Sequence, residues 1–134
     1  MRMALTVWGN KISPVFDSAR RLLIVDVEKG VVIRRHHEFF HSELPYNRAA
    51  MLFDLRAKVL ICGAISQIFA NVIEAYGIKI VPFVTGDVDQ VLNHYLKGAP
   101  FTAHFYMPGC GHKGRRLRSR RGRGYLKICN KERR

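Results

Sequence analysis

The chain has 134 residues, of which 48% are hydrophobic and 25% charged, and its formal net charge is +13. This length and apolar content predict one domain that buries a hydrophobic core and needs no disulfide bond for stability. The cysteines at positions 62, 110 and 129 form no Cys-x-x-Cys pair, which argues against a disulfide framework or a zinc ribbon and favours reduced thiols in the cytoplasm. The apolar start, residues 1–7, is interrupted too early for a signal peptide or a membrane span.

The positive charge is concentrated at the end of the chain. Residues 113–134 hold 11 of the 23 basic residues and one of the 10 acidic residues. About +10 therefore belongs to this segment and only about +3 to residues 1–112.

The first half of the chain reads as three strands and a loop. Residues 2–8 alternate with a period of two, which predicts a strand. Residues 9–17 are a loop, because Gly9 and Asn10 turn the chain and Pro14 keeps Ser13 out of helical angles. Loops of this length are often functional. Residues 21–27 and 31–40 are strands joined by a hairpin turn that contains Gly30.

Helices and short buried strands alternate in the second half. A helix within residues 42–58 has Pro45 in its first turn and turns Ala49, Leu52 and Phe53 inward. The strand 59–62, the turn at Gly63, a helix over 65–76 and the strand 78–83 form a βαβ unit. The stripe of that helix is Ile65, Ile68, Phe69, Val72, Ile73 and Tyr76, and Gly77 ends it.

The third helix follows Gly86. Asp87 and Gln90 have the spacing of a capping box. Its apolar stripe is Val88, Val91, Leu92, Tyr95 and Leu96, and Gly98 stops it. Residues 99–112 are irregular, and residues 113–134 form an Arg/Gly-rich tail with too little apolar content to order itself.

The fold class is therefore α/β. The order β-β-β-α-β-α-β-α predicts a five-stranded mixed sheet flanked by helices and followed by a disordered basic tail. The strands 31–40, 59–62 and 78–83 are expected to run parallel to the first strand. Ligands of such sheets lie outside the carboxyl ends of the parallel strands. This edge would gather residues 9–17, 63–66 and 84–87.

Several short motifs follow one another along residues 1–112. They are Val7-Trp8-Gly9, Ser13-Pro14-Val15-Phe16-Asp17, Ala19-Arg20-Arg21, Leu60-Ile61-Cys62-Gly63-Ala64-Ile65, Gly86-Asp87-Val88 and Met107-Pro108-Gly109-Cys110. Together they resemble the dinitrogenase iron-molybdenum cofactor biosynthesis domain family, with Ser66 where a glycine is frequent. The resemblance implies a ribonuclease H-like fold and a small carrier or scaffold for a metal-sulfur cluster, of the iron-sulfur or the iron-molybdenum-sulfur type.

A metal-sulfur cluster is an anion held by thiolates, with imidazole as an occasional substitute. Cys110, in a Pro-Gly-Cys-Gly turn, is the first candidate ligand, and a surface thiol is the alternative. His112, two residues on, is a second candidate. Cys62 ends a buried strand beside the expected site, but a buried cysteine often only fills a core.

Three histidines crowd the end of the third strand. A period of two places His37 on one strand face and His36 on the other, so they cannot all reach one metal from a regular strand. His37 and His41 are metal candidates, and solvated strand histidines are the alternative.

Other candidates lie at the expected edge. Ser13, Gly63 and Arg20 are expected to contact the cofactor, and Arg20 and Arg21 either offer charge to an anion or are solvated. Asp17 is expected to cap its own loop, and Asp87 to cap a helix.

The run of arginines between Arg115 and Arg123 admits three interpretations. It binds nucleic acid through salt-sensitive, sequence-independent contacts, it holds an anionic cluster or an acidic partner, or it is a solubilising extension.

The sequence thus predicts a cytoplasmic, non-enzymatic cluster carrier whose partners are the donor and acceptor of the cluster, with no membrane contact. The alternative is a nucleic-acid-binding module that uses the basic tail. A nuclease would need carboxylates converging on two metal ions, and Asp17, Asp26, Asp54 and Asp87 are scattered over different elements. The chain also lacks a P-loop, a GxGxxG fingerprint and a nucleophile elbow.

Overall fold

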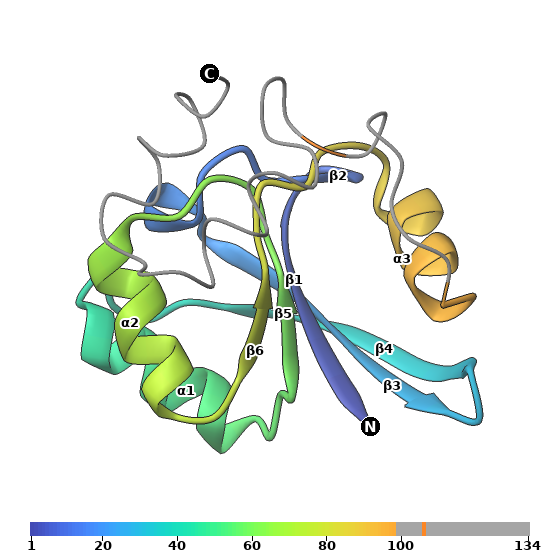
Figure 1. Ribbon diagram of the computed structural model, residues 1–134, viewed down its shortest axis with the longest axis horizontal. Coiled ribbons are helices and arrows are strands. Elements are labelled where there is room, and N and C mark those ends of the chain that lie inside the picture. Colours follow the sequence, from blue (N-terminus) through green and yellow to red (C-terminus); the bar gives the residue numbers. More distant parts are fainter. Residues whose placement is uncertain (99–105, 107–134) are drawn as a thin grey trace.

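A computed structural model describes residues 1–98 and Tyr106. Figure 1 shows one twisted sheet with helices packed on it. The strands are β1 (Arg2–Trp8), β2 (Lys11–Ile12), β3 (Arg21–Glu28), β4 (Val31–Phe39), β5 (Val59–Ile61) and β6 (Lys79–Val81). The helices are α1 (Pro45–Asp54), α2 (Gln67–Ala75) and α3 (Val88–Leu96), with a short 3-10 turn, η1, at Phe16–Ser18.

The sheet is mixed, as predicted. Its strand order is β4-β3-β1-β5-β6, with β2 paired to β1. β1 runs antiparallel to β3 and parallel to β5, and β6 is parallel to β5. All five predicted strands are present, and the α/β fold class is confirmed. The sixth strand, β2, has two residues inside the predicted loop 9–17 and places Ile12 opposite Val7.

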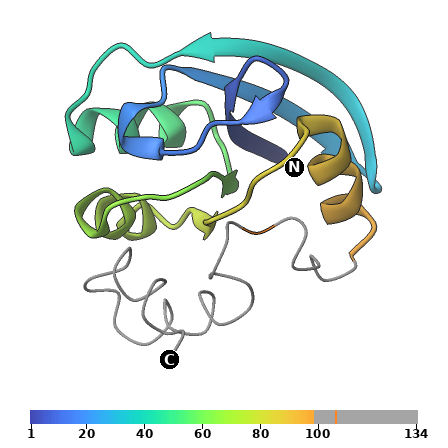
Figure 2. The ribbon, with the colours of Figure 1, turned by 90° about the horizontal axis from the view of Figure 1, so that it is seen from above.

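Two apolar clusters lie on opposite faces of the sheet. Figure 2 shows α1 and α2 on one side and α3 on the other. Ala4 faces the α1/α2 cluster, whereas Met3 and Leu5 face the α3 cluster. This alternation is what the period of two predicts. No helix in the described part is long and apolar enough to span a membrane.

The helix ends confirm the local signals. Pro45 is the first residue of α1, and Gly77 follows α2 with a φ of +83°. The carboxylate of Asp87 accepts hydrogen bonds from the amides of Asp89 (3.0 Å) and Gln90 (3.4 Å). Asp87 therefore caps α3, in agreement with its helix-cap interpretation.

Three side chains expected to face inward are exposed: Phe53 on α1, Ile68 on α2 and Tyr76, which follows α2. Phe53 comes one residue after buried Leu52, which turns it by about 100° away from the core. On α2 the small residue Ala70 is buried with Phe69 and Ile73, so the buried face is rotated away from Ile68. The apolar stripe expected from the sequence included only large residues and left out Ala70, so it gave the wrong orientation for the buried face.

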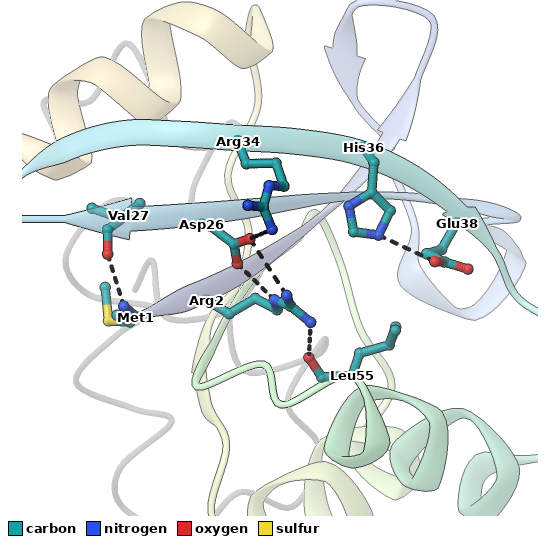
Figure 3. Close-up of polar contacts among 8 residues, drawn as sticks. All are labelled: Met1, Arg2, Asp26, Val27, Arg34, His36, Glu38 and Leu55. Atoms are coloured by element: carbon teal, nitrogen blue, oxygen red, sulfur yellow. Dashed lines mark hydrogen bonds and ion pairs between the residues drawn. The ribbon is translucent and has the colours of Figure 1, made fainter.

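Charged side chains tie the start of the chain to two neighbouring elements (Figure 3). Arg2 Nε donates to the carboxylate of Asp26 at 2.7 Å, and Arg2 Nη1 donates to the carbonyl of Leu55 at 2.9 Å. Arg34 lies 3.6 Å from the same carboxylate. The hydrogen bond from Arg2 is the main cause that holds the pKa of Asp26 below its ordinary value.

The Asp26 carboxylate should make stability depend on pH. Its folded-state pKa lies below the ordinary value of 3.8, so its contribution is present above that value and is lost as the pH falls through the folded pKa. We expect Asp26→Asn to unfold at lower urea concentration than the wild type at neutral pH, with the difference shrinking below about pH 4. Urea unfolding from neutral to acidic pH measures this, and a difference that stays constant over the whole range would contradict it.

Candidate functional site

The loop after β1 and the turn before α3 are held together by backbone hydrogen bonds. The amide of Ile12 donates to the carbonyl of Gly86 at 3.0 Å, and the amide of Val88 donates to that of Asn10 at 2.8 Å. These bonds join the ends of β1 and β6 at what we call the carboxyl edge, where the parallel strands β1, β5 and β6 end. The structure thus brings together two of the three segments expected there.

The turn after β5 is held in the same way. The amide of Phe16 donates to the carbonyl of Ala64 at 2.7 Å, and the amide of Ala64 donates to that of Pro14 at 2.8 Å. The amide of Ser66 donates to the Asp17 carboxylate at 3.1 Å. Asp17 therefore caps the start of α2, whereas the sequence assigned it to its own loop.

Gly63 is the point of closest approach at the carboxyl edge. A Cβ at this position would collide with the carbonyl oxygens of Ser13 and Pro14. On its other side, the carbonyl of Gly63 accepts from the amide of Phe83 at 2.9 Å. Phe83 has a φ of +63°, a conformation that is rare for a bulky residue. The turn at Gly63 therefore depends on the missing side chain.

A cavity of about 530 Å³ opens beside this turn. We call it the basic hollow, and it is lined by Val7, Trp8, Ser13, Pro14, Val15, Ser18, Ala19, Arg20, Arg21 and Phe39. None of the described residues that form this lining carries a carboxylate. Trp8 is 73% exposed, and the guanidinium of Arg21 lies 5.8 Å from the ring centre of Phe39. The hollow can therefore offer positive charge to an anion, with apolar aromatic surface beside it.

Arg48 contacts the η1 turn next to this region, and no role was predicted for it. Only 3% of this residue is exposed, and burial lowers its pKa. It donates to the carbonyls of Phe16 at 2.8 Å and Ser42 at 2.9 Å. Its guanidinium lies 4.1 Å from the ring centre of Phe40. Its four-residue spacing from Leu52 was the only sequence signal that it faces the core.

The structure separates the remaining ligand candidates. Cys62 is 0% exposed and belongs to the α1/α2 core cluster. His37 is exposed on β4, and His36 bonds to Glu38 at 3.1 Å. His41 lines a different cavity, of about 580 Å³, beside α1. Within residues 1–98 and Tyr106, no three His, Cys, Asp or Glu side chains form a group that could hold a metal ion.

Ser13, Arg20 and Gly63 do come together. Ser13 and Arg20 line the basic hollow, and Gly63 lies against the Ser13 carbonyl behind it. Cys110, His112 and the arginines between Arg115 and Arg123 lie outside the described residues, so their expected roles stay predictions.

Comparison with known proteins gives a family and a fold. Residues 1–98 match the family described as dinitrogenase iron-molybdenum cofactor. The protein PH0822 is 21% identical, with a TM-score of 0.69 over 73% of this chain and 92% of its own. The apo form of the orange protein from Desulfovibrio gigas is 24% identical, with a TM-score of 0.63 over 76% of this chain and 92% of its own.

A third solved structure, of the mj0327 protein from Methanocaldococcus jannaschii, is 22% identical. Its TM-score is 0.58, and the match covers 73% of this chain and 89% of its own. At these identities the three structures show that the fold is shared. No curated protein matches the chain.

Gly63→Ala tests the close approach at the carboxyl edge. Because the new methyl group collides with two backbone carbonyls, we expect the free energy of unfolding to fall by about 1–3 kcal/mol. Gly9→Ala is the control, since its Cβ meets nothing within 4 Å and only its φ of +66° is strained. Urea unfolding compares each variant with the wild type, and a Gly63→Ala variant as stable as the wild type would contradict the tight contact at Gly63.

Arg48→Met tests the buried guanidinium. The variant removes two hydrogen bonds from a charged group, to the carbonyls of Phe16 and Ser42, which should lower the free energy of unfolding by about 2–4 kcal/mol. Arg34→Met is the control, because the Arg34 side chain is 68% exposed and its loss should change stability by no more than about 1 kcal/mol. Chemical unfolding that finds both variants equally stable would argue against a structural role for Arg48.

Proposed function

The chain belongs to the dinitrogenase iron-molybdenum cofactor family, and we propose that it carries a metal-sulfur cluster as cargo without catalysing a reaction. The observation that carries this proposal is the basic hollow, where Arg20 and Arg21 stand beside Trp8 and Phe39 and no carboxylate is among the described lining residues. A metal-sulfur cluster is anionic and polarisable. Guanidinium groups therefore suit its charge, whereas a carboxylate would repel it.

The described residues suit electrostatic holding better than coordination. The only thiol among them, Cys62, is fully buried in the core, and reaching it would require the carboxyl edge to open. We therefore assign the first thiolate ligand to Cys110, with His112 as a second donor. His37 and His41 do not line the basic hollow, so we rank them lower.

The chain returns to the carboxyl edge shortly before Cys110. Tyr106 forms a β-bridge with Val84 and is buried in the α3 cluster. Four residues of extended chain span at most about 14 Å. This short tether supports the assignment of Cys110 to the same edge as the basic hollow.

The cluster type and the partners follow from the same chemistry. One chain has three cysteines, so a cluster needing four thiolates would also take a histidine, an outside ligand or a second chain. We propose an iron-sulfur or iron-molybdenum-sulfur cluster, supplied by a donor protein and passed to an acceptor.

Anaerobic reconstitution with iron and sulfide, with and without molybdate, tests the carrier function. The wild type should bind metal and sulfide in fixed proportion and show a charge-transfer band. Cys110→Ala should lose the band, whereas Cys129→Ala, the matched cysteine control, should keep it. An Arg20→Ala/Arg21→Ala variant should retain the cluster about tenfold less well on desalting, because it loses two cationic contacts.

Two results would contradict the proposal. Equal loading of the wild type and Cys110→Ala would remove the thiolate assignment. No loading of any variant, together with salt-dependent binding of RNA or DNA, would favour the nucleic-acid interpretation of the tail.

A further inference from the structure

The outer edge of β4 is open over a long stretch. In the part of the chain that the structure describes, β4 pairs with β3 alone and lies at one end of the strand order (Figure 2). It has nine residues, whereas the strand at the other end, β6, has three. A strand with a single neighbour leaves alternate amides and carbonyls facing outward. β4 therefore offers an extended row of hydrogen-bonding groups.

The side chains of β4 combine exposed apolar groups with a cationic centre. Val31 and Ile33 near its start and Phe39 at its end are exposed. Arg34 and Arg35 lie between them, and both guanidinium groups are well exposed. The edge thus carries apolar anchors at both ends and positive charge in the middle.

This charge pattern disfavours a second copy of the chain as the occupant. Antiparallel pairing of two β4 strands about their middle would set Arg34 and Arg35 of one copy beside those of the other. Like charges placed opposite each other destabilise a strand pair. An extended partner with acidic side chains would instead meet complementary charge.

The two arginines remain available to such a partner. Arg34 lies 3.6 Å from the carboxylate of Asp26, and Arg35 lies 3.0 Å from that of Asp89. The arginine of each pair is exposed, and an ion pair of an exposed side chain contributes little. The guanidinium groups can therefore contact a second carboxylate without breaking the fold.

The edge also leads to the basic hollow. Phe39, the last residue of β4, lines that hollow together with Arg21. A partner strand laid along β4 would end at its mouth.

We propose that the outer edge of β4 binds an extended, acidic segment of a partner protein as an added strand. The main chain supplies the pairing, and Arg34 and Arg35 select for acidic side chains. This docking requires no cargo, so it goes beyond the carrier function and stands or falls separately from it.

The test uses the full chain without metal and a labelled peptide about as long as β4 that alternates glutamate with valine and threonine. Fluorescence anisotropy should show saturable binding. The same peptide with lysine in place of glutamate, or with alternate backbone nitrogens methylated, should bind at least about tenfold more weakly. Amide NMR signals of residues 31–39 should shift on binding.

Variants locate the site. Arg34→Glu/Arg35→Glu should weaken peptide binding at least about tenfold. Lys79→Glu, a charge reversal of an exposed residue on the opposite edge strand β6, should change it less than about twofold. The methylated peptide needs no change in the protein, so it tests the proposal even if the double variant folds poorly.

Three results would overturn this inference. Absence of binding is the first. Equal binding of the methylated peptide is the second, because contact would then depend on charge alone, including that of residues 113–134. A concentration-dependent dimer in sedimentation experiments whose interface maps to β4 is the third, because it would assign the edge to a second copy.

Discussion

The contact of the Ser13 and Pro14 carbonyls with Gly63 is the constraint on which the carboxyl edge depends. Because glycine has no Cβ, the loop after β1 can lie directly on the turn after β5. The amide of Ala64 can then donate to Pro14, and that of Phe16 to Ala64. The three segments are thus held by main-chain hydrogen bonds, and the position of the basic hollow is fixed by backbone geometry rather than by mobile side chains.

Arg48 donates hydrogen bonds to two backbone carbonyls that lie outside the strands of the sheet. The carbonyls of Phe16 and Ser42 lie beside aromatic rings, and a leucine at position 48 could donate to neither, although the Phe16 carbonyl would still accept from the amide of Ala19. A guanidinium serves both carbonyls and also lies against the ring of Phe40. Burying a cation costs several kcal/mol, and hydrogen bonds to a charged group return about 1.5–3 kcal/mol each. Because Arg48 makes two such bonds and also lies against an aromatic ring, it offsets that cost and holds the η1 turn in place.

Signals that act over a few residues predicted most of the fold. The period of two in β1 and the cap at Asp87 marked their elements closely, and the βαβ rule placed the turns at one edge. Features that depend on distant partners could not be predicted. β2 pairs with β1, but Ile12 is also held by a bond to Gly86 across the fold, and the rotation of α2 follows from what packs on Ala70. In the hollow, Ser13 and Arg20 were predicted, whereas Trp8 and Phe39 became its walls only through the pairing of β1, β3 and β4.

In the proposed carrier, the arginines of the hollow attract the cluster and a thiolate coordinates it, and this separation affects how the cluster can be released. An exposed guanidinium contributes at most about 1 kcal/mol to an ionic contact, so Arg20 and Arg21 would attract a cluster without trapping it. In the proposed carrier, coordination depends on a thiolate from a different segment, and the strength of holding is set by how readily that sulfur is exchanged for a ligand of the acceptor. A partner strand on β4 would bring such a ligand to the mouth of the hollow, because Phe39 belongs to both surfaces. Docking and ligand exchange would then occur at adjoining sites, which favours transfer only when the acceptor is in place.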